Sequence, residues 1–241
     1  MGRGQTPSLW QSVPWTWAYL RRLPLFPLAL LAALFPLTAV AESMQDIPLA
    51  NPTLADSDQK RQELTYLATC ALPPTMRLVS TQGTERFTFP GSMGLAPQWI
   101  SDGLSLQQER WVSACLYALT NAYGKHVELS MRAALPLLRA TVEEEQQFPI
   151  FEGGFFGNRF ASPPVAYACV GPRTKRYQAA PVWKDRVCTV SSGRRTADGR
   201  PLSLCEFILT GPCSNPASFT VAGVHYDEVI STYLQMTPAQ P

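Results

Sequence analysis

The feature that most constrains the fold is a set of six cysteines, all of which follow an apolar N-terminal segment. An even number of cysteines in an exported chain predicts disulfides rather than free thiols. Zinc is the alternative, but its ligands usually occur as close pairs, and the sequence has no Cys-x-x-Cys and two histidines in all. We therefore expect three disulfides, no catalytic thiol, no metal and no cofactor, from Cys70, Cys115, Cys169, Cys188, Cys205 and Cys213.

Sequence alone leaves the connectivity of six cysteines open. Pairing between neighbours along the chain gives Cys70–Cys115, Cys169–Cys188 and Cys205–Cys213, which we take as the expectation. Each such bond stabilises a small domain by about 2–4 kcal/mol, mainly by restricting the unfolded chain.

The first 41 residues have the pattern of an export signal. Their charges are three arginines, residues 23–41 carry no charge, and the segment ends in Ala39-Val40-Ala41 before Glu42. A basic start, an apolar run and a small-x-small site predict a cleaved signal peptide over 1–41. The alternative is an uncleaved membrane anchor, which prolines within the apolar run disfavour. We expect export to the periplasm or the medium, and contact with a membrane only if the signal stays uncleaved.

The rest of the chain is nearly neutral. The leader holds three of the 20 basic residues, so 17 remain beside 18 acidic ones, a net charge of −1. This balance gives no global argument for nucleic-acid binding. Residues 42–55 contain two prolines without periodicity and are interpreted as a linker, and 56–241 as one exported domain.

Two segments have helical periodicity. Residues 58–71 have an apolar face after a capping Asp58, and Pro73-Pro74 ends the helix. Residues 106–123 follow a capping box of Ser105 and Gln108, carry Cys115 in an apolar stripe, and end before Gly124. A short acidic helix is expected after Thr141.

Several segments have strand patterns. These are a hairpin of 76–80 with 86–89, a strand over 126–132, a hairpin turning on Gly157-Asn158, and β-rich runs at 203–209 and 224–234. The sequence thus predicts an α+β domain, with two principal helices on a mainly antiparallel sheet and a disulfide-linked, β-rich C-terminal third.

Possible catalytic residues are few. Glu152 lies among glycines and phenylalanines, where burial would raise a carboxyl pKa. Asp227 shares a strand face with His225, and Ser92 is a conceivable nucleophile, although PGSMG departs from the Gly-x-Ser-x-Gly pattern. A hydrolase acting on a glycan or an ester, with Glu152, His225 or Asp227 in its site, is therefore the alternative hypothesis.

The clearest local charge feature is a basic stretch between residues 173 and 200. With Tyr177 and Trp183 interleaved, it suggests a face that binds an anionic wall polymer, a lipid headgroup or another polyanion. A long solvated loop explains the same composition and stays open. A non-enzymatic binding module is the favoured hypothesis, with binding by Arg173, Lys175, Arg176, Lys184, Arg186, Arg194 and Arg195.

Three segments carry a resemblance: RWVSACLYALTNAYG (110–124), EGGFFGN (152–158) and EVISTYL (228–234). In these the chain resembles an uncharacterised group of exported, cysteine-containing bacterial proteins. The resemblance implies a bacterial, exported protein and transfers no catalytic residue.

Overall fold

The structure is a computed structural model that describes residues 44–122, 125–178, 180, 182–213 and 218–236. The predicted signal peptide, the Gly124 helix cap and the end of the C-terminal tail lie outside these residues. The fold has helices and mixed, mainly antiparallel sheets, which confirms the predicted α+β class.

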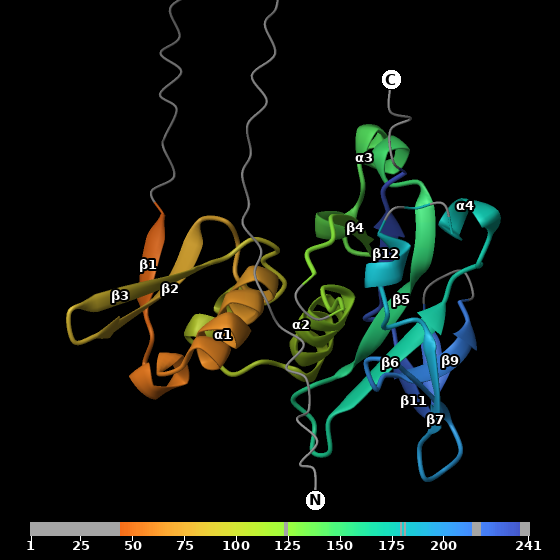
Figure 1. Cartoon of the computed structure of the whole chain (residues 1–241). Helices are drawn as coiled ribbons and strands as arrows, with labels where there is room; N and C mark the ends of the chain where they lie inside the picture. Colours follow the sequence, from red (N-terminus) through yellow and green to blue (C-terminus); the bar gives the residue numbers. More distant parts are fainter. Residues whose placement is uncertain (1–43, 123–124, 179, 181, 214–217, 237–241) are drawn as a thin grey trace, which may run out of the picture.

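The N-terminal part is a small sheet beside a helix (Figure 1). Strands β2 (Met76–Gln82) and β3 (Glu85–Pro90) form the predicted hairpin. Strand β1 (Gln45–Pro48) pairs in parallel with β2, and a 3-10 helix, η1 (Pro52–Ala55), follows it. The interpretation of 42–55 as a linker is therefore wrong for these residues, because backbone pairing with β2 needs no apolar periodicity in β1.

The two principal helices lie next to each other. Helix α1 (Asp58–Ala71) begins one residue earlier than a cap at Asp58 implies, since Ser57 Oγ accepts from the Lys60 N–H. Helix α2 (Leu106–Ala118) has the predicted capping box but ends five residues early. The two helices are joined by the predicted Cys70–Cys115 disulfide, in which both cysteines are fully buried.

Within the described residues, the largest sheet has seven strands in the order β4-β12-β5-β6-β9-β8-β7. Its pairs are antiparallel except for β6 with β9. The C-terminal strand β12 lies between β4 and β5, next to one edge of the sheet, so segments that are distant in the sequence pair there. The strands are β4 (Leu129–Arg132), β5 (Ile150–Asn158), β6 (Val165–Val170), β7 (Ser191–Arg195), β8 (Pro201–Ser203), β9 (Ile208–Pro212) and β12 (Ile230–Leu234).

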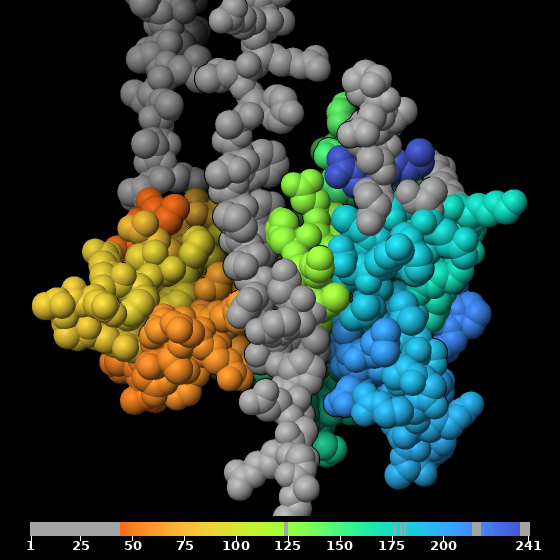
Figure 2. Space-filling view, in the orientation of Figure 1, coloured from red at the N-terminus to blue at the C-terminus, as the bar shows by residue number. Residues whose placement is uncertain are grey.

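Helix α2 is the central element of the core. It packs on α1 on one side and on β5 and β12 on the other, so Trp111 to Ala118 are all buried rather than one stripe of them. Figure 2 shows residues of the N-terminal part, in orange and yellow, forming one lobe, and the β-rich C-terminal part, in blue, forming another. One apolar cluster, which includes Ala68, Val112 and Phe155, spans both lobes.

Short elements complete the fold. A separate hairpin of β10 (Phe219–Val221) and β11 (Val224–Tyr226) packs Phe219 on Phe156, with ring centroids 4.7 Å apart. The acidic helix α3 (Val142–Gln147) is present after Thr141. The predicted strand 126–132 is limited to β4. The remaining helices are α4 (Lys175–Gln178) and the 3-10 helices η2 (Pro97–Ile100), η3 (Pro136–Leu138) and η4 (Trp183–Asp185).

Two of the expected disulfide pairings are wrong. The structure pairs Cys169 with Cys213 and Cys188 with Cys205, with Cα–Cα distances of 4.9 Å in each. The parallel pairing of β6 with β9 explains the first, because it brings Val170 beside Pro212. No local signal in the sequence specifies that register.

The EGGFFGN segment is one long strand rather than a hairpin. Gly153 and Gly154 lie so close to β6 that a Cβ at these positions would meet the Cys169 carbonyl oxygen at 2.4 Å and the Cys169 sulfur at 2.9 Å. The glycines therefore permit close packing of β5 on β6, and the chain turns after Asn158.

Candidate functional site

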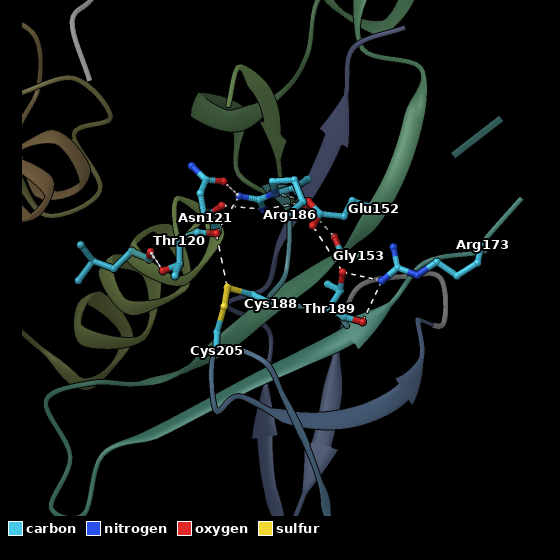
Figure 3. Close-up of polar contacts among 12 residues, drawn as sticks. Thr120, Asn121, Glu152, Gly153, Arg173, Arg186, Cys188, Thr189 and Cys205 are labelled. Carbon is cyan, nitrogen blue, oxygen red and sulfur yellow. Dashed lines mark hydrogen bonds and ion pairs between the residues drawn. A yellow bond between two sulfur atoms is a disulfide. The ribbon is translucent and has the colours of Figure 1, made fainter. Parts of the chain in front are cut away.

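A β-bulge at Glu152 places one carboxylate in the centre of the molecule. Thr232 of β12 pairs with Gly153, whereas Tyr233 pairs with Phe151, so Glu152 is the extra residue. Bulges redirect side chains out of the regular alternation. The Glu152 side chain is 0% exposed and is directed toward the C-terminal end of α2 (Figure 3).

Arg186, in the loop after η4, is the partner of this carboxylate. Its Nη2 and Nε lie 2.8 and 2.9 Å from Glu152 Oε2. The other N–H groups donate to the carbonyls of Ala118 and Thr120 at 3.0 and 2.9 Å, and to Asn121 Oδ1 at 2.6 Å. All five N–H donors of the guanidinium therefore have acceptors, three of which lie at the end of α2.

Further hydrogen bonds join this pair to neighbouring strands. Thr232 Oγ1 donates to Glu152 Oε2 at 2.7 Å, and Thr189 Oγ1 lies 3.5 Å from Oε1. Arg173 in turn donates to the Thr189 hydroxyl and carbonyl at 2.6 and 2.8 Å. The network connects α2, β5, β12 and the loop 183–189.

Burial changes the role expected for two residues. Arg186 is 0% exposed and cannot contribute to a solvent-facing basic surface. Glu152 is equally shielded and is already bonded to Arg186, so its carboxylate cannot reach a substrate in this structure. Both residues act as structural groups: a buried ion pair with satisfied hydrogen bonds holds helix, sheet and loop together.

The other basic residues of the stretch lie in two places. Arg173, Lys175 and Lys184 are exposed beside α4, and we call these three residues the α4 corner. Arg173 lies over the ring of Tyr177, 4.2 Å from its centroid, and Lys184 lies 6.0 Å from that of Trp183. Arg176 also belongs to α4.

Arg194 and Arg195 lie on the edge strand β7, well apart from α4 in Figure 1. Arg194 pairs with Glu206 at 3.0 Å, and Arg195 donates to the Gly199 carbonyl at 2.6 Å. The stretch thus forms two separate basic regions, and the one on β7 is partly neutralised.

His225 contacts Asp227, as their alternation along a strand suggested. His225 Nε2 lies 3.0 Å from Asp227 Oδ1, and Nδ1 lies 3.0 Å from Thr220 Oγ1 on β10. The side chains of His225 and Asp227 are 57% and 73% exposed. The hydroxyl group that contacts His225 is therefore that of Thr220, not that of Ser92. Ser92 follows β3, and its N–H donates to the Leu72 carbonyl at 2.7 Å.

Two surface cavities have the size of small-ligand sites. The first, of about 360 Å³, lies between α2, the start of β6 and the turn that joins β8 to β9. The second, of about 310 Å³, lies between α1, α2 and Phe160. Arg159, directly after β5, lines both. Glu152, His225 and Asp227 line neither cavity.

Tyr117 of α2 forms one wall of the first cavity. Burial raises the pKa of its phenol, while the nearby Arg159 charge acts in the opposite direction. The hydroxyl therefore stays protonated at neutral pH and donates to the Val165 carbonyl at 3.0 Å.

Sequence reasoning missed Arg159, Tyr117 and Thr220. Tyr117 lies inside a helix assigned wholly to the core, and Arg159 is a single arginine beside a turn. Thr220 was recoverable, because a two-residue turn at Ala222-Gly223 places it opposite His225 in a hairpin.

The described residues lack both a metal-binding cluster and a membrane-spanning helix. They contain no group of three or more His, Cys, Asp or Glu side chains that could hold a metal ion. Their helices are all too short or too polar to cross a membrane. A comparison of the chain with protein-family models, curated proteins and solved structures finds no match.

Proposed function

We propose that the protein is a non-enzymatic binding module that attaches to an anionic polymer outside the cytoplasm. The observation that supports this function is the α4 corner. Lys175 and Lys184 are exposed, and neither is in an ion pair with a described residue. Asp185, the nearest acid in sequence, leaves the corner with a net positive charge.

The arrangement of the corner suits a repeating anion. Exposed cations attract an anionic chain at long range and exchange partners easily, so affinity comes from several weak contacts. The rings of Tyr177 and Trp183 lie next to Arg173 and Lys184, at 4.2 and 6.0 Å from their centroids. Phosphate or carboxylate groups of an anionic wall polymer are the proposed ligands.

The compartment supports a ligand of this kind. All six cysteines are in disulfides, which indicates an oxidising, non-cytoplasmic environment. Cleavage of the predicted signal would leave a chain starting at Glu42, which intact mass spectrometry of the exported protein measures directly.

The test is salt-dependent retention on heparin, with Lys175→Ala/Lys184→Ala as the variant. This variant is expected to elute at lower salt than the wild type, because two of the contacting charges are gone. The matched control, Arg194→Ala/Arg195→Ala, removes the same charge from β7 and should elute with the wild type. Equal shifts for both variants would mean that net charge alone drives retention.

A second arm separates a polymer from a lipid surface. Vesicles containing phosphatidylglycerol present the same charge on a membrane. If the protein co-sediments with these vesicles and is not retained on heparin, its ligand is a lipid headgroup and not an anionic polymer.

The alternative is a hydrolase acting on an ester or a glycan. The hydroxyl–imidazole–carboxylate contacts among Thr220, His225 and Asp227 favour it, because a histidine placed in this way can activate a nucleophile. Its test is hydrolysis of p-nitrophenyl acetate. A rate above that of buffer that is lost in His225→Ala, but kept in His126→Ala, would establish the enzyme.

A further inference from the structure

Arg159 places a cation at the first cavity. Among the described residues, the Arg159 side chain makes no hydrogen bond or ion pair, although it lies at the rim of an apolar depression. An arginine at such a position can form a bidentate pair with a carboxylate, through two parallel N–H···O hydrogen bonds. Glu206 is the acid at the same rim, and its charge is already paired with Arg194.

The backbone of Arg159 is held in place by buried polar side chains. Its N–H donates to Ser113 Oγ of α2 at 2.8 Å, and Ser113 is 0% exposed. The preceding Asn158 is 5% exposed, donates to Glu109 at 2.8 Å, and accepts from the Phe160 and Ala161 N–H groups. The arginine is therefore presented from a fixed turn.

The opposite wall is equally well held. The Cys188–Cys205 disulfide and the Ser203 hydroxyl, which accepts from the N–H groups of Cys205 and Phe207, fix the turn between β8 and β9. Glu206 in this turn has φ of 65°, a left-handed conformation that side-chain-bearing residues adopt at a cost. Such backbone is retained where the surrounding structure enforces it.

The interior of the cavity is mainly apolar. Its volume of about 360 Å³ falls in the range of small-molecule sites. Aromatic surface is supplied by Tyr117 and Phe207, whose ring centroids are 5.1 Å apart. Aliphatic surface is supplied by Val165, Ala166, Leu202 and Ile208.

From this juxtaposition we propose a second site, distinct from the α4 corner. The cavity binds a small monoanionic carboxylate with an apolar body, with Arg159 holding the carboxylate and the Tyr117–Phe207 wall holding the body. The Tyr117 hydroxyl is already committed to Val165, so specificity for the acid rests on Arg159.

The test uses benzoate and hexanoate as probes, with benzyl alcohol and hexanol as uncharged equivalents, in titrations followed by NMR. Ligands of this size are expected to bind with a Kd on the order of 1 mM. The acids should bind and the alcohols should bind at least about tenfold more weakly, as expected for loss of a charge-assisted contact.

Arg159→Gln is expected to weaken binding of the acids by about tenfold or more. Arg139→Gln is the matched control, because Arg139 is also exposed, is also without an ion pair among the described residues, and lies outside the cavity. An unchanged Kd in Arg159→Gln, or equal losses in the two variants, would overturn the proposal.

The cavity itself is tested by filling it. Leu202 lines the first cavity outside the main apolar clusters, so Leu202→Trp should block binding with little effect on the core. Leu54→Trp fills the second cavity in the same way and should leave binding unchanged. Circular dichroism and the Tm confirm folding of each variant. Block by Leu54→Trp alone would reject the first cavity as the site.

Discussion

The Arg186 guanidinium lies 2.8 Å from the Glu152 carboxylate, and neither side chain is exposed to solvent. Burial of an ion pair costs hydration of both charges, and the pair is tolerated because each charge is compensated. Since Arg186 also donates hydrogen bonds to the Ala118 and Thr120 carbonyls at the end of α2, the loss of either residue affects several elements at once.

Glu152→Gln should therefore be strongly destabilising. It keeps the shape of the side chain but leaves the Arg186 charge buried without a counter-charge, which costs about 3–5 kcal/mol of unfolding free energy. Urea denaturation measures the change. Glu206→Gln breaks the exposed pair with Arg194 and should cost about 1 kcal/mol or less. Similar losses in the two variants would contradict a special role for the buried pair.

Gly153→Ala tests the close packing of β5 on β6. The added methyl would lie 2.4 Å from the Cys169 carbonyl oxygen, a backbone atom that cannot rotate away. We expect a loss of about 1–3 kcal/mol, as for other overpacked sites. Gly103→Ala, where the added methyl meets nothing within 4 Å, should be near neutral in the same denaturation experiment.

The disulfide connectivity has a direct chemical test. Trypsin leaves Cys205 and Cys213 in one peptide, because no lysine or arginine follows Arg200. A second cleavage after Glu206 separates them. Non-reducing mass spectrometry should then find Cys188 linked to the Cys205 fragment and Cys169 linked to the Cys213 fragment. A Cys169–Cys188 peptide would contradict the structure.

Acid should loosen β1 from its sheet. Asp46 of β1 pairs with Arg77 of β2 and Arg86 of β3, and the hydrogen bond from Arg77, with the charges of both arginines, lowers the pKa of its carboxyl. A folded-state pKa below the unfolded value of about 3.9 stabilises the fold at neutral pH, and this contribution is lost as the pH falls below about 4.

In Asp46→Asn that contribution is absent at every pH. The variant should therefore lose less stability than the wild type between neutral pH and about pH 3, measured by urea denaturation at both. Asp102→Asn removes the same charge from an exposed residue outside the sheet and should behave like the wild type. If Asp46→Asn loses as much stability in acid as the wild type, the contacts of Asp46 with Arg77 and Arg86 are not the cause of the acid sensitivity.

The sequence predicted best what is determined locally. The capping box at Ser105 and Gln108 and the period of the apolar residues place α2 correctly, and the burial of Cys115 follows from them. The predicted helix end was wrong, and the carbonyls of Ala118 and Thr120 at the observed end accept hydrogen bonds from Arg186, which is 66 or more residues away in the sequence.

Non-local features could not be predicted. Arg186 and Lys184 belong to the same basic stretch, but Arg186 is buried and Lys184 is exposed. The partners of Arg186, which are Glu152 on β5 and carbonyls at the end of α2, lie 34 or more residues away in the sequence. The pairing of Cys169 with Cys213 likewise depends on the β6–β9 register. No sequence pattern marks Arg159 as a site residue, because the two cavities that it lines are formed by segments far apart in the sequence.

The Cys188–Cys205 bond lies within the loop that Cys169–Cys213 closes. Synthesis from the N-terminus completes the Cys70–Cys115 pair first, and then delivers Cys169 and Cys188 before the correct partner of either exists. Among the four C-terminal cysteines, the first oxidation available therefore joins the wrong sulfurs. Maturation must either wait for the last strands or exchange that bond afterwards. Yield of native protein should consequently depend on a thiol shuffling catalyst in whichever host makes it.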